Sequence, residues 1–427
     1  KIQKFYEADE KLVERKKEVL KLIEEGNNET SQKASEIANK VINRHLKTFS
    51  RLNVAYDLLV WERDIIDVGL WPSVFEKLKT EKLIENPTYG DYKDTWLVRF
   101  GFDTRDDKIL VKSDGTATYT AKDLAYEMWK FSLLDIDFPY FTRGTQYNKQ
   151  PLTTTKGGIQ EKSEDTTRNI PKPVKVFTLI DERQEYPRQV IKYTLEQLGY
   201  KDEAKNSIHV GYGVVRLSRN ALEDLGITPK EKKESYAMSG RSGIGVKIDD
   251  LMDKTEEKIA EINPELSEED VKTLSNATIR YYMLRNRINK EAIFDFAEAL
   301  KTDGNTGVYL EYAYARCCNI LNKINALPSF DDITPPQDLD QTNKNLISLL
   351  ENYPSQIEKS SQVCDPSLLT DYAFSIASAF AKFYETNPVL KAQSIELKIF
   401  RIQMVAATKE VLGNILNLLG ISPLTKI

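Results

Sequence analysis

The first fifty residues have apolar side chains at helical spacing within a strongly charged sequence. Val19, Leu20 and Ile23 belong to a first stripe, the pair Asn27-Asn28 interrupts it, and the stretch "SEIANKVINRHLKTFSRL" resumes it. Steps of three and four residues place such side chains on one face of an α-helix. The pattern therefore predicts two helices with a break between them.

From residue 255 onward the pattern is helical and stays so. Three stripes contain apolar residues at steps of three and four: Leu310, Ala313, Tyr314, Cys317 and Leu321; Leu369, Tyr372, Ala373, Ile376, Phe380 and Phe383; and Leu412, Ile415, Leu416 and Leu419. Stripes of this kind are typical of a bundle whose helices share one core. We predict an all-α domain over residues 291–427, joined through a helical segment over 256–290 to a first domain over 1–255.

Residues 51–215 have mixed periodicity. "YDLLVWE" and "TWLVRF" have strand composition, and "KILVKSDGTATYT" is typical of a strand, an Asp-Gly turn and a second strand. Residues 143–172 contain Gly, Thr, Pro and charges with almost no apolar residue, which predicts a loop or mobile insertion.

A strand–helix–strand pattern follows the Thr-rich segment. "VKVFTLI" predicts a buried strand, "DERQEYPRQVIKYTLEQLGY" a helix, and "SIHVGYGVV" another strand. Such a βαβ unit implies a parallel sheet, with ligands at the carboxyl ends of its strands. Tyr119, Asp123, Gln184 and His209 all lie at or just beyond predicted strand ends. The predicted fold class is α/β followed by all-α.

Charge and cysteine content narrow the functional classes. The net charge is −5, and residues 291–427, with 11 Lys+Arg and 16 Asp+Glu, account for all of it. Any binding of nucleic acid therefore does not rest on bulk electrostatics. No apolar run is long enough to cross a membrane and no secretory signal opens the chain. Three cysteines at no metal-like spacing predict a reduced, cytoplasmic protein without a metal site.

One short stretch carries candidate chemistry. In "KSDGTATYTAKDLAYEMW" a phenol, Tyr119, and a carboxylate, Asp123, are four residues apart at the start of a helix. This spacing favours a pocket for a cationic ligand. The alternative interpretation is a capping acid next to a core tyrosine.

Four stretches, in order, resemble the arginyl-tRNA synthetases, and their details are more similar to archaeal than to bacterial members. They are "KSDGTATYTAKDLA", "AMSGRSGIGVKIDDL", "GNTGVYLEYAYAR" and "AATKEVLGNILNLLGI". The resemblance implies a partial Rossmann-type class I catalytic domain and a helical anticodon-binding domain. It also implies ATP-dependent activation of L-arginine and its transfer to tRNA(Arg), with Mg²⁺ accompanying ATP and no tightly bound cofactor. We expect a monomer.

The resemblance assigns roles to individual residues. Tyr119, Asp123 and Gln184 match positions that hold the arginine side chain, and a carboxylate suits a guanidinium because that group is a planar fork of donors with fixed charge. His209, Tyr212 and Gly213 match a run beside the adenosine, although a core role is the alternative for His209. Tyr309, Tyr312 and Arg316 match positions near the anticodon, where RNA bases stack on aromatic and guanidinium planes; a place in the bundle core is the alternative.

The signature loop departs from the family pattern. Its catalytic residues would be Met238, Ser239 and Arg241, with Gly240 and Gly243 allowing the backbone to approach phosphate. However, Ala237 and Gly240 stand where class I enzymes have lysines.

A second departure is larger. The two histidines, His45 and His209, form no His-Ile-Gly-His-type motif. With Lys1 rather than methionine at the start, we expect a C-terminal part that lacks the N-terminal half-site and is inactive alone. The alternative function is a non-catalytic tRNA-binding or partner-binding module.

Overall fold

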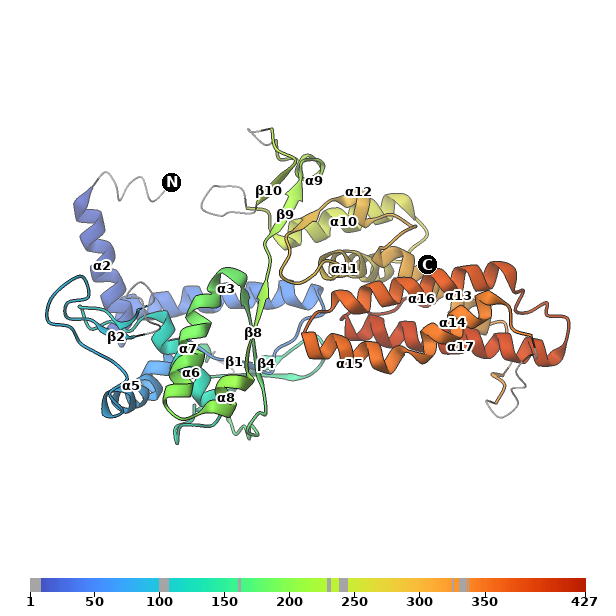
Figure 1. Ribbon diagram of the computed structural model, residues 1–427. Helices are drawn as coiled ribbons and strands as arrows, with labels where there is room; N and C mark the ends of the chain where they lie inside the picture. The colour runs from blue at the N-terminus through green and yellow to red at the C-terminus, as the bar shows by residue number, and fades with distance from the viewer. Residues whose placement is uncertain are drawn as a thin grey trace. The chain divides into compact units, whose positions relative to one another are not determined.

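The computed structural model describes residues 9–99, 107–159, 163–228, 232–237, 245–324, 326–329, 336 and 338–427. The chain folds into two compact units, one of residues 1–50 and 55–210 and one of residues 51–54 and 211–427. The domain boundaries that the sequence predicts at residues 255 and 290 stay predictions. Figure 1 labels the elements of both units.

The first unit mixes helices with short strands. Its helices are α2 (Glu10–Glu25), α3 (Glu29–Arg51), α4 (Asp64–Asp67), α5 (Leu70–Thr80), α6 (Tyr119–Lys130), α7 (Glu185–Gln197) and α8 (Lys201–Asn206), with 3-10 turns η2 (Lys156–Gly158) and η3 (Glu182–Gln184). Its strands are β1 (Leu58–Leu59), β2 (Trp96–Val98), β3 (Lys108–Val111), β4 (Tyr140–Thr145), β5 (Pro151–Thr154), β6 (Glu164–Thr166), β7 (Val176–Asp181) and β8 (Ser207–Tyr212). The predicted break between the first two helices is confirmed: Gly26 and Asn27 both adopt positive φ, and the Asn28 side chain accepts a hydrogen bond from Ser31 N at 2.9 Å.

The prediction of a loop over residues 143–172 is wrong. Strands β4, β5 and β6 lie wholly or partly in this segment and belong to a four-stranded sheet of order β1-β5-β4-β6, in which β5 pairs parallel to β1 and antiparallel to β4. Threonine has a high preference for strands and brings its own hydrogen-bonding group. Thr154 is fully buried, and its Oγ1 accepts from Trp61 Nε1 at 3.2 Å. The polar composition therefore reflects a core with satisfied hydroxyl groups.

The predicted strand–helix–strand unit forms β7, α7, α8 and β8, with β7 and β8 adjacent in a two-stranded sheet. Val190, Ile191 and Leu195 of α7 are buried, as predicted. The expectation of a buried strand is wrong for one face of β7, because Phe177 is 48% and Leu179 67% exposed. This apolar face therefore lacks a cover among the described residues.

The second unit combines a small sheet with a helical bundle. Its strands β9 (Val215–Ser218), β10 (Ser235–Ala237) and β11 (Ala292–Phe294) form a sheet of order β10-β9-β11. Its helices are α9 (Arg219–Asp224), α10 (Ile248–Ile262), α11 (Glu268–Leu284), α12 (Phe296–Ala299), α13 (Gly307–Leu321), α14 (Gln341–Glu351), α15 (Tyr353–Val363), α16 (Ser367–Thr386) and α17 (Ile395–Leu418). Strand β11 corrects the expectation that the chain is helical throughout after residue 255. Its partner β9 lies about 75 residues away in sequence, beyond the reach of local periodicity.

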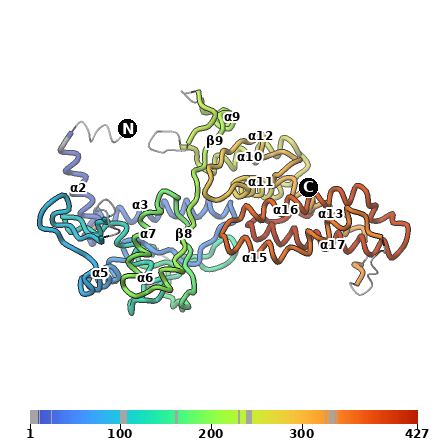
Figure 2. The backbone as a smooth tube through the Cα atoms, in the orientation of Figure 1, coloured from blue at the N-terminus to red at the C-terminus, as the bar shows by residue number. Residues whose placement is uncertain are grey.

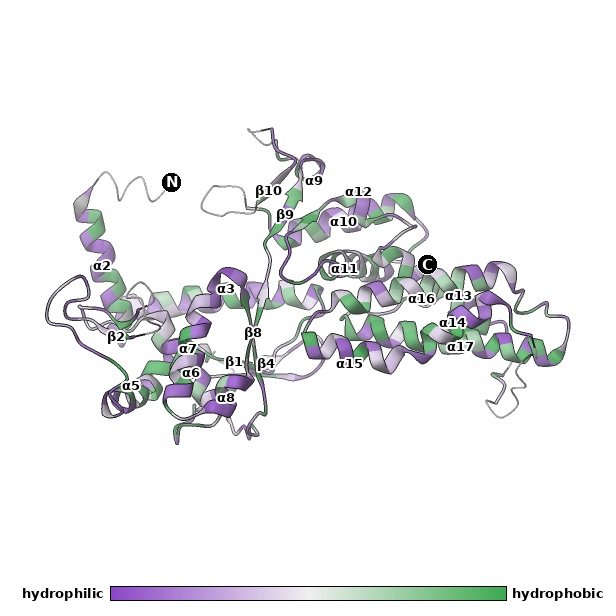
Figure 3. Ribbon diagram, in the orientation of Figure 1, coloured by the Kyte–Doolittle hydropathy of each residue, from purple (hydrophilic) through white to green (hydrophobic). Residues whose placement is uncertain are grey.

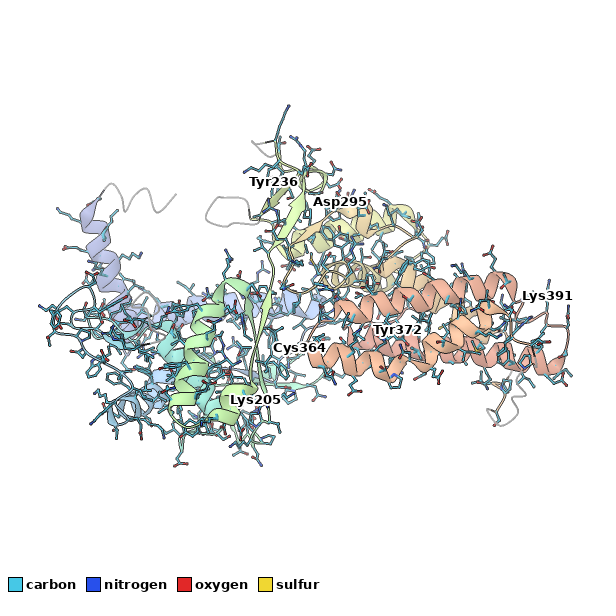
Figure 4. All side chains as sticks on the ribbon, viewed as in Figure 1. Lys205, Tyr236, Asp295, Cys364, Tyr372 and Lys391 are labelled. Atoms are coloured by element: carbon cyan, nitrogen blue, oxygen red, sulfur yellow. The ribbon has the colours of Figure 1, made fainter. Side chains whose placement is uncertain are left out.

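The three predicted helical stripes meet in one hydrophobic core, formed mainly by α13, α16 and α17. Their paths can be followed in Figure 2, and Figure 3 shows hydrophobic and hydrophilic residues alternating along them. Tyr372, labelled in Figure 4, points into this bundle from α16, and its hydroxyl donates to Leu349 O. The predicted combination of an α/β part with an all-α part is confirmed. Among the described residues, no helix is long and apolar enough to cross a bilayer.

Candidate functional site

The start of helix α6 places the first two candidate residues. Thr116 N donates to Asp114 Oδ1 at 2.9 Å and Gly115 adopts φ +82°, so the Asp-Gly turn forms as predicted. The predicted second strand shrinks to a single bridge between Val111 and Ala117. Thr118 is extended, and the helix begins at Tyr119. The turn therefore delivers the phenol to the first helical position.

Asp123 lies on the next turn of α6, in a largely desolvated place. It makes no hydrogen bond or ion pair with any residue that the structure describes, and this desolvation raises the pKa of its carboxyl group. The charges of Arg188 and Lys130 oppose that rise in pKa. Because Asp123 is the fifth residue of the helix and bonds to no free amide, it does not cap α6. Tyr119 is 53% exposed and is not a core tyrosine.

A lysine and a second tyrosine, missed by sequence reasoning, lie next to Tyr119. Lys108 Nζ is 3.4 Å from Tyr119 Oη, and it lies 5.2 and 5.4 Å from the ring centroids of Tyr119 and Tyr186. An ammonium group over aromatic faces is an attractive contact. The lysine thus brings the start of α6 close to the start of α7, where Gln184 is partly buried. The motif "DERQEYP" contained Tyr186, but no local pattern singled out Lys108.

The three candidate ATP-binding residues differ in their surroundings. His209 Nε2 is buried and has no hydrogen-bond partner among the residues that the structure describes, whereas Tyr212 is 46% exposed. Gly213 donates its N–H to Ile288 O at 2.8 Å, and a Cβ there would lie 2.2 Å from Lys290 O. Close backbone packing therefore explains the glycine without a ligand. The orphaned nitrogen of His209 leaves a buried group free to bind one.

The catalytic loop lies outside the described residues. Met238, Ser239, Gly240, Arg241 and Gly243 all belong to this part of the chain, so their predicted roles stay predictions. Strand β10 ends at Ala237 before the loop, and α10 begins at Ile248 after it. No group of three or more His, Cys, Asp or Glu side chains able to hold a metal occurs among the described residues.

The three candidate RNA-binding residues lie together. Tyr309, Tyr312 and Arg316 of α13 line a hollow of about 320 Å³, together with Thr302, Ala313, Ala377, Phe380 and Ala381. The Tyr309 ring packs at 5.7 Å from that of Phe374, and the Arg316 guanidinium lies 5.6 Å from the ring centroid of Tyr384. Both tyrosines are partly buried, so each contacts the core and still faces the hollow.

Comparison with known proteins supports the resemblance that the sequence motifs indicate. Residues 310–427 match the family described as "DALR anticodon binding domain". The chain is 31% identical to the arginine–tRNA ligase of Thermococcus sibiricus, over 94% of this chain and 62% of that protein. It is also 31% identical to the enzyme of Pyrococcus furiosus, over 98% of this chain and 65% of that protein. The chain thus spans less than two thirds of the length of these curated relatives.

Solved structures agree with the sequence comparison. The arginyl-tRNA synthetase of Thermus thermophilus superposes with a TM-score of 0.77 at 26% identity, over 92% of this chain and 64% of that one. The agreement includes both the α/β part and the helical bundle, because the match extends over nearly the whole chain. By sequence and by fold, this chain is similar to the arginyl-tRNA synthetases over somewhat less than two thirds of their length.

Proposed function

We propose that the chain forms the arginine-selecting and anticodon-binding parts of an arginine–tRNA ligase. The observation that carries this proposal is Asp123, a desolvated carboxylate without a protein partner among the described residues, beside the exposed ring of Tyr119. A buried carboxylate without a partner costs free energy, and a guanidinium would supply the missing charge and donors. Gln184 offers a neutral amide for a further donor or acceptor.

The proposed chemistry is positioning and electrostatic stabilisation. ATP, with Mg²⁺, would lie beside His209, Tyr212 and Gly213, and the loop with Met238, Ser239 and Arg241 would stabilise its phosphates. Transfer of the activated arginine would go to tRNA(Arg), in the cytoplasm, with the protein acting as a monomer. The sequence holds no His-Ile-Gly-His-type motif, so we propose that the 427 residues alone catalyse no ATP–pyrophosphate exchange.

A non-catalytic tRNA-binding module is the second candidate function. The hollow on α13 favours it, because this hollow needs nothing from the α/β part. Binding of the free amino acid separates the two candidates, because only the ligase proposal requires an arginine site.

Calorimetry with L-arginine, L-lysine and L-citrulline tests the proposed function. Citrulline keeps the shape of arginine and loses the charge, while lysine keeps the charge and loses the planar fork. We expect binding of arginine, weaker binding of lysine and no detectable binding of citrulline. Equal heats for arginine and citrulline, or none for arginine, would leave the RNA-binding module as the better account.

We further expect Tyr309→Ala and Tyr312→Ala to weaken binding of a tRNA(Arg) anticodon stem-loop by roughly 1–3 kcal/mol for each stacked base lost. The dependence of binding on salt concentration should change little, because no phosphate contact is removed. Fluorescence anisotropy at several salt concentrations measures both quantities. Tyr384→Ala is a useful comparison, since this ring lies against Arg316 but does not line the hollow. Parent-like affinity in both folded α13 variants would contradict the assignment.

A further inference from the structure

A buried polar network joins three elements of the first unit. Glu127 on α6, Arg188 on α7 and Ser207 at the start of β8 are all at most 5% exposed. Arg188 Nη2 lies 2.8 Å from Glu127 Oε1 and donates to Ser207 Oγ at 3.1 Å. Ser207 Oγ in turn donates to the same Glu127 oxygen at 2.5 Å. We call Glu127, Arg188 and Ser207 the clasp.

Each clasp residue is one helical turn, or one two-residue strand repeat, away in sequence from a candidate site residue. Glu127 is four residues after Asp123 on α6, so the two side chains are on one face of the helix. Arg188 is four residues after Gln184, which directly precedes α7. Ser207 is two residues before His209 on β8, so these two side chains are on the same face of the strand. The network thus lies next in sequence and on the same elements as the proposed arginine contacts and His209.

The clasp is poorly suited to a purely stabilising role. Taking two charges out of water costs several kcal/mol for each ion, and apolar residues of similar volume often stabilise a protein as well or better. In addition, Arg188 Nε is buried without a hydrogen-bond partner in the described part of the chain, which is a further cost. What the network does provide is fixed geometry, because both oxygens of Glu127 are engaged: Lys130 Nζ donates to Oε2 at 3.1 Å.

We propose that the clasp positions Asp123, Gln184 and His209 relative to one another, so that Glu127, Arg188 and Ser207 are positioning residues of the amino-acid activation site. This positioning role rests on the proposed function, because it assumes that the three residues bind arginine and ATP. The contacts within the clasp do not depend on that assumption. The charge of Arg188 also acts on the Asp123 carboxylate and favours its ionised form. That form is the one that a guanidinium requires.

The test replaces the charged pair by apolar residues of similar size. The double variant Glu127→Leu/Arg188→Met removes both members of the buried ion pair together, so we expect it to fold with a melting temperature close to that of the parent. Arg143→Met is the matched control: Arg143 is 7% exposed and donates to Asn39 Oδ1 and Asn43 Oδ1, in a different network. Ser207→Ala is the milder second variant, since it keeps the ion pair.

Two readouts separate positioning from stability. The chain has two histidines, so histidine-selective isotope labelling gives one imidazole signal for His209 and one for His45 as an internal reference. In the double variant we expect the His209 signal to shift and broaden while the His45 signal stays unchanged. Arginine affinity should fall about 10- to 100-fold, because small misplacements of functional groups have effects of this size. Ser207→Ala should show the same changes in smaller measure, and Arg143→Met should show neither.

The outcomes distinguish this inference from the proposed function. A parent chain that binds no arginine counts against the proposed function, whereas the His209 signal still decides whether the clasp sets the geometry. A folded double variant whose His209 signal matches that of the parent overturns the inference. If the double variant fails to fold, an unchanged His209 signal in Ser207→Ala overturns it equally.

Discussion

Asp123→Asn is expected to weaken arginine binding by roughly 2–4 kcal/mol, because the substitution leaves a buried guanidinium without its countercharge. This free energy corresponds to about a 30- to 1000-fold change in dissociation constant. The affinity for ATP should barely change, since the substitution removes no charge that ATP requires. Calorimetric titration of parent and variant with each ligand measures both effects.

The same substitution should leave the folded protein as stable as before, or more stable. Desolvation raises the pKa of Asp123, so the ionised carboxylate is less stable in the folded chain than in the unfolded chain. Linkage then requires that this group lowers stability as pH rises above the ordinary carboxyl pKa. Asparagine removes that cost. Weaker binding together with unchanged or higher stability at neutral pH is characteristic of a residue retained for function.

The matched control is Asp202→Asn, an exposed aspartate in the first turn of α8 in the same unit. It should change neither arginine binding nor the melting temperature beyond small surface effects. Arginine affinity of Asp123→Asn within twofold of the parent would exclude Asp123 from the pocket. A large fall in melting temperature would instead indicate a structural role.

Helices with long apolar stripes could be predicted from the sequence because their information is local. Phe380 and Phe383 of α16 and Leu412 and Leu416 of α17 recur at steps that one helix face dictates, and all four are in the bundle core. Tyr309 and Tyr312 are on one such helix, so their common hollow follows from the same periodicity. The hollow itself needed α16, whose Ala377 and Phe380 complete it from more than 60 residues away.

The Thr-rich segment could not be predicted as sheet because its partners are remote and polar. Arg143 is buried through hydrogen bonds to Asn39 and Asn43 of α3, about 100 residues earlier in the chain. Thr155 Oγ1 accepts from Trp61 N, 94 residues away. A search for alternating apolar residues finds nothing in such a segment, since its interior is satisfied by hydrogen bonds rather than by apolar burial.

The sequence could predict only those candidate site residues that occur together in one short motif. Asp123 and Tyr119 stood four residues apart in one stretch, whereas Lys108, Arg188 and Ser207 are brought to them by three different elements. No spacing along the chain links those three residues. Chemistry that depends on separate elements becomes visible only when the fold places them together.

Glu311 is a buried acid in the helical bundle. It is fully buried on α13 and accepts a hydrogen bond from Leu424 N at 2.7 Å through Oε2, while no described residue bonds to its Oε1. Burial raises the pKa of its carboxyl group from the ordinary 4.5 to about 8. Near neutral pH the group is therefore protonated in the folded chain and ionised in the unfolded one.

The free energy of unfolding of the second unit should consequently fall between about pH 4.5 and 8. Over this window the folded state binds one more proton than the unfolded state, so stability decreases with rising pH at up to about 1.4 kcal/mol per pH unit. Below this range both states are protonated, and above it both are ionised, so the contribution of Glu311 levels off at each end. Its full extent is on the order of several kcal/mol.

Glu311→Gln should remove this dependence, because the amide is neutral at every pH and its oxygen can still accept from Leu424 N. We expect parent and variant to have similar stability near pH 4.5 and the variant to be more stable by several kcal/mol at pH 8.5, a difference of several degrees in melting temperature for a unit of this size. Glu351→Gln, an exposed glutamate at the end of α14, controls for the loss of one surface charge. Denaturant unfolding of all three proteins from pH 4.5 to 9, followed by circular dichroism, measures the difference. Parallel pH profiles for the parent and Glu311→Gln would mean that Glu311 is ionised in the folded chain at neutral pH, and that water or another donor reaches the oxygen that now has no partner.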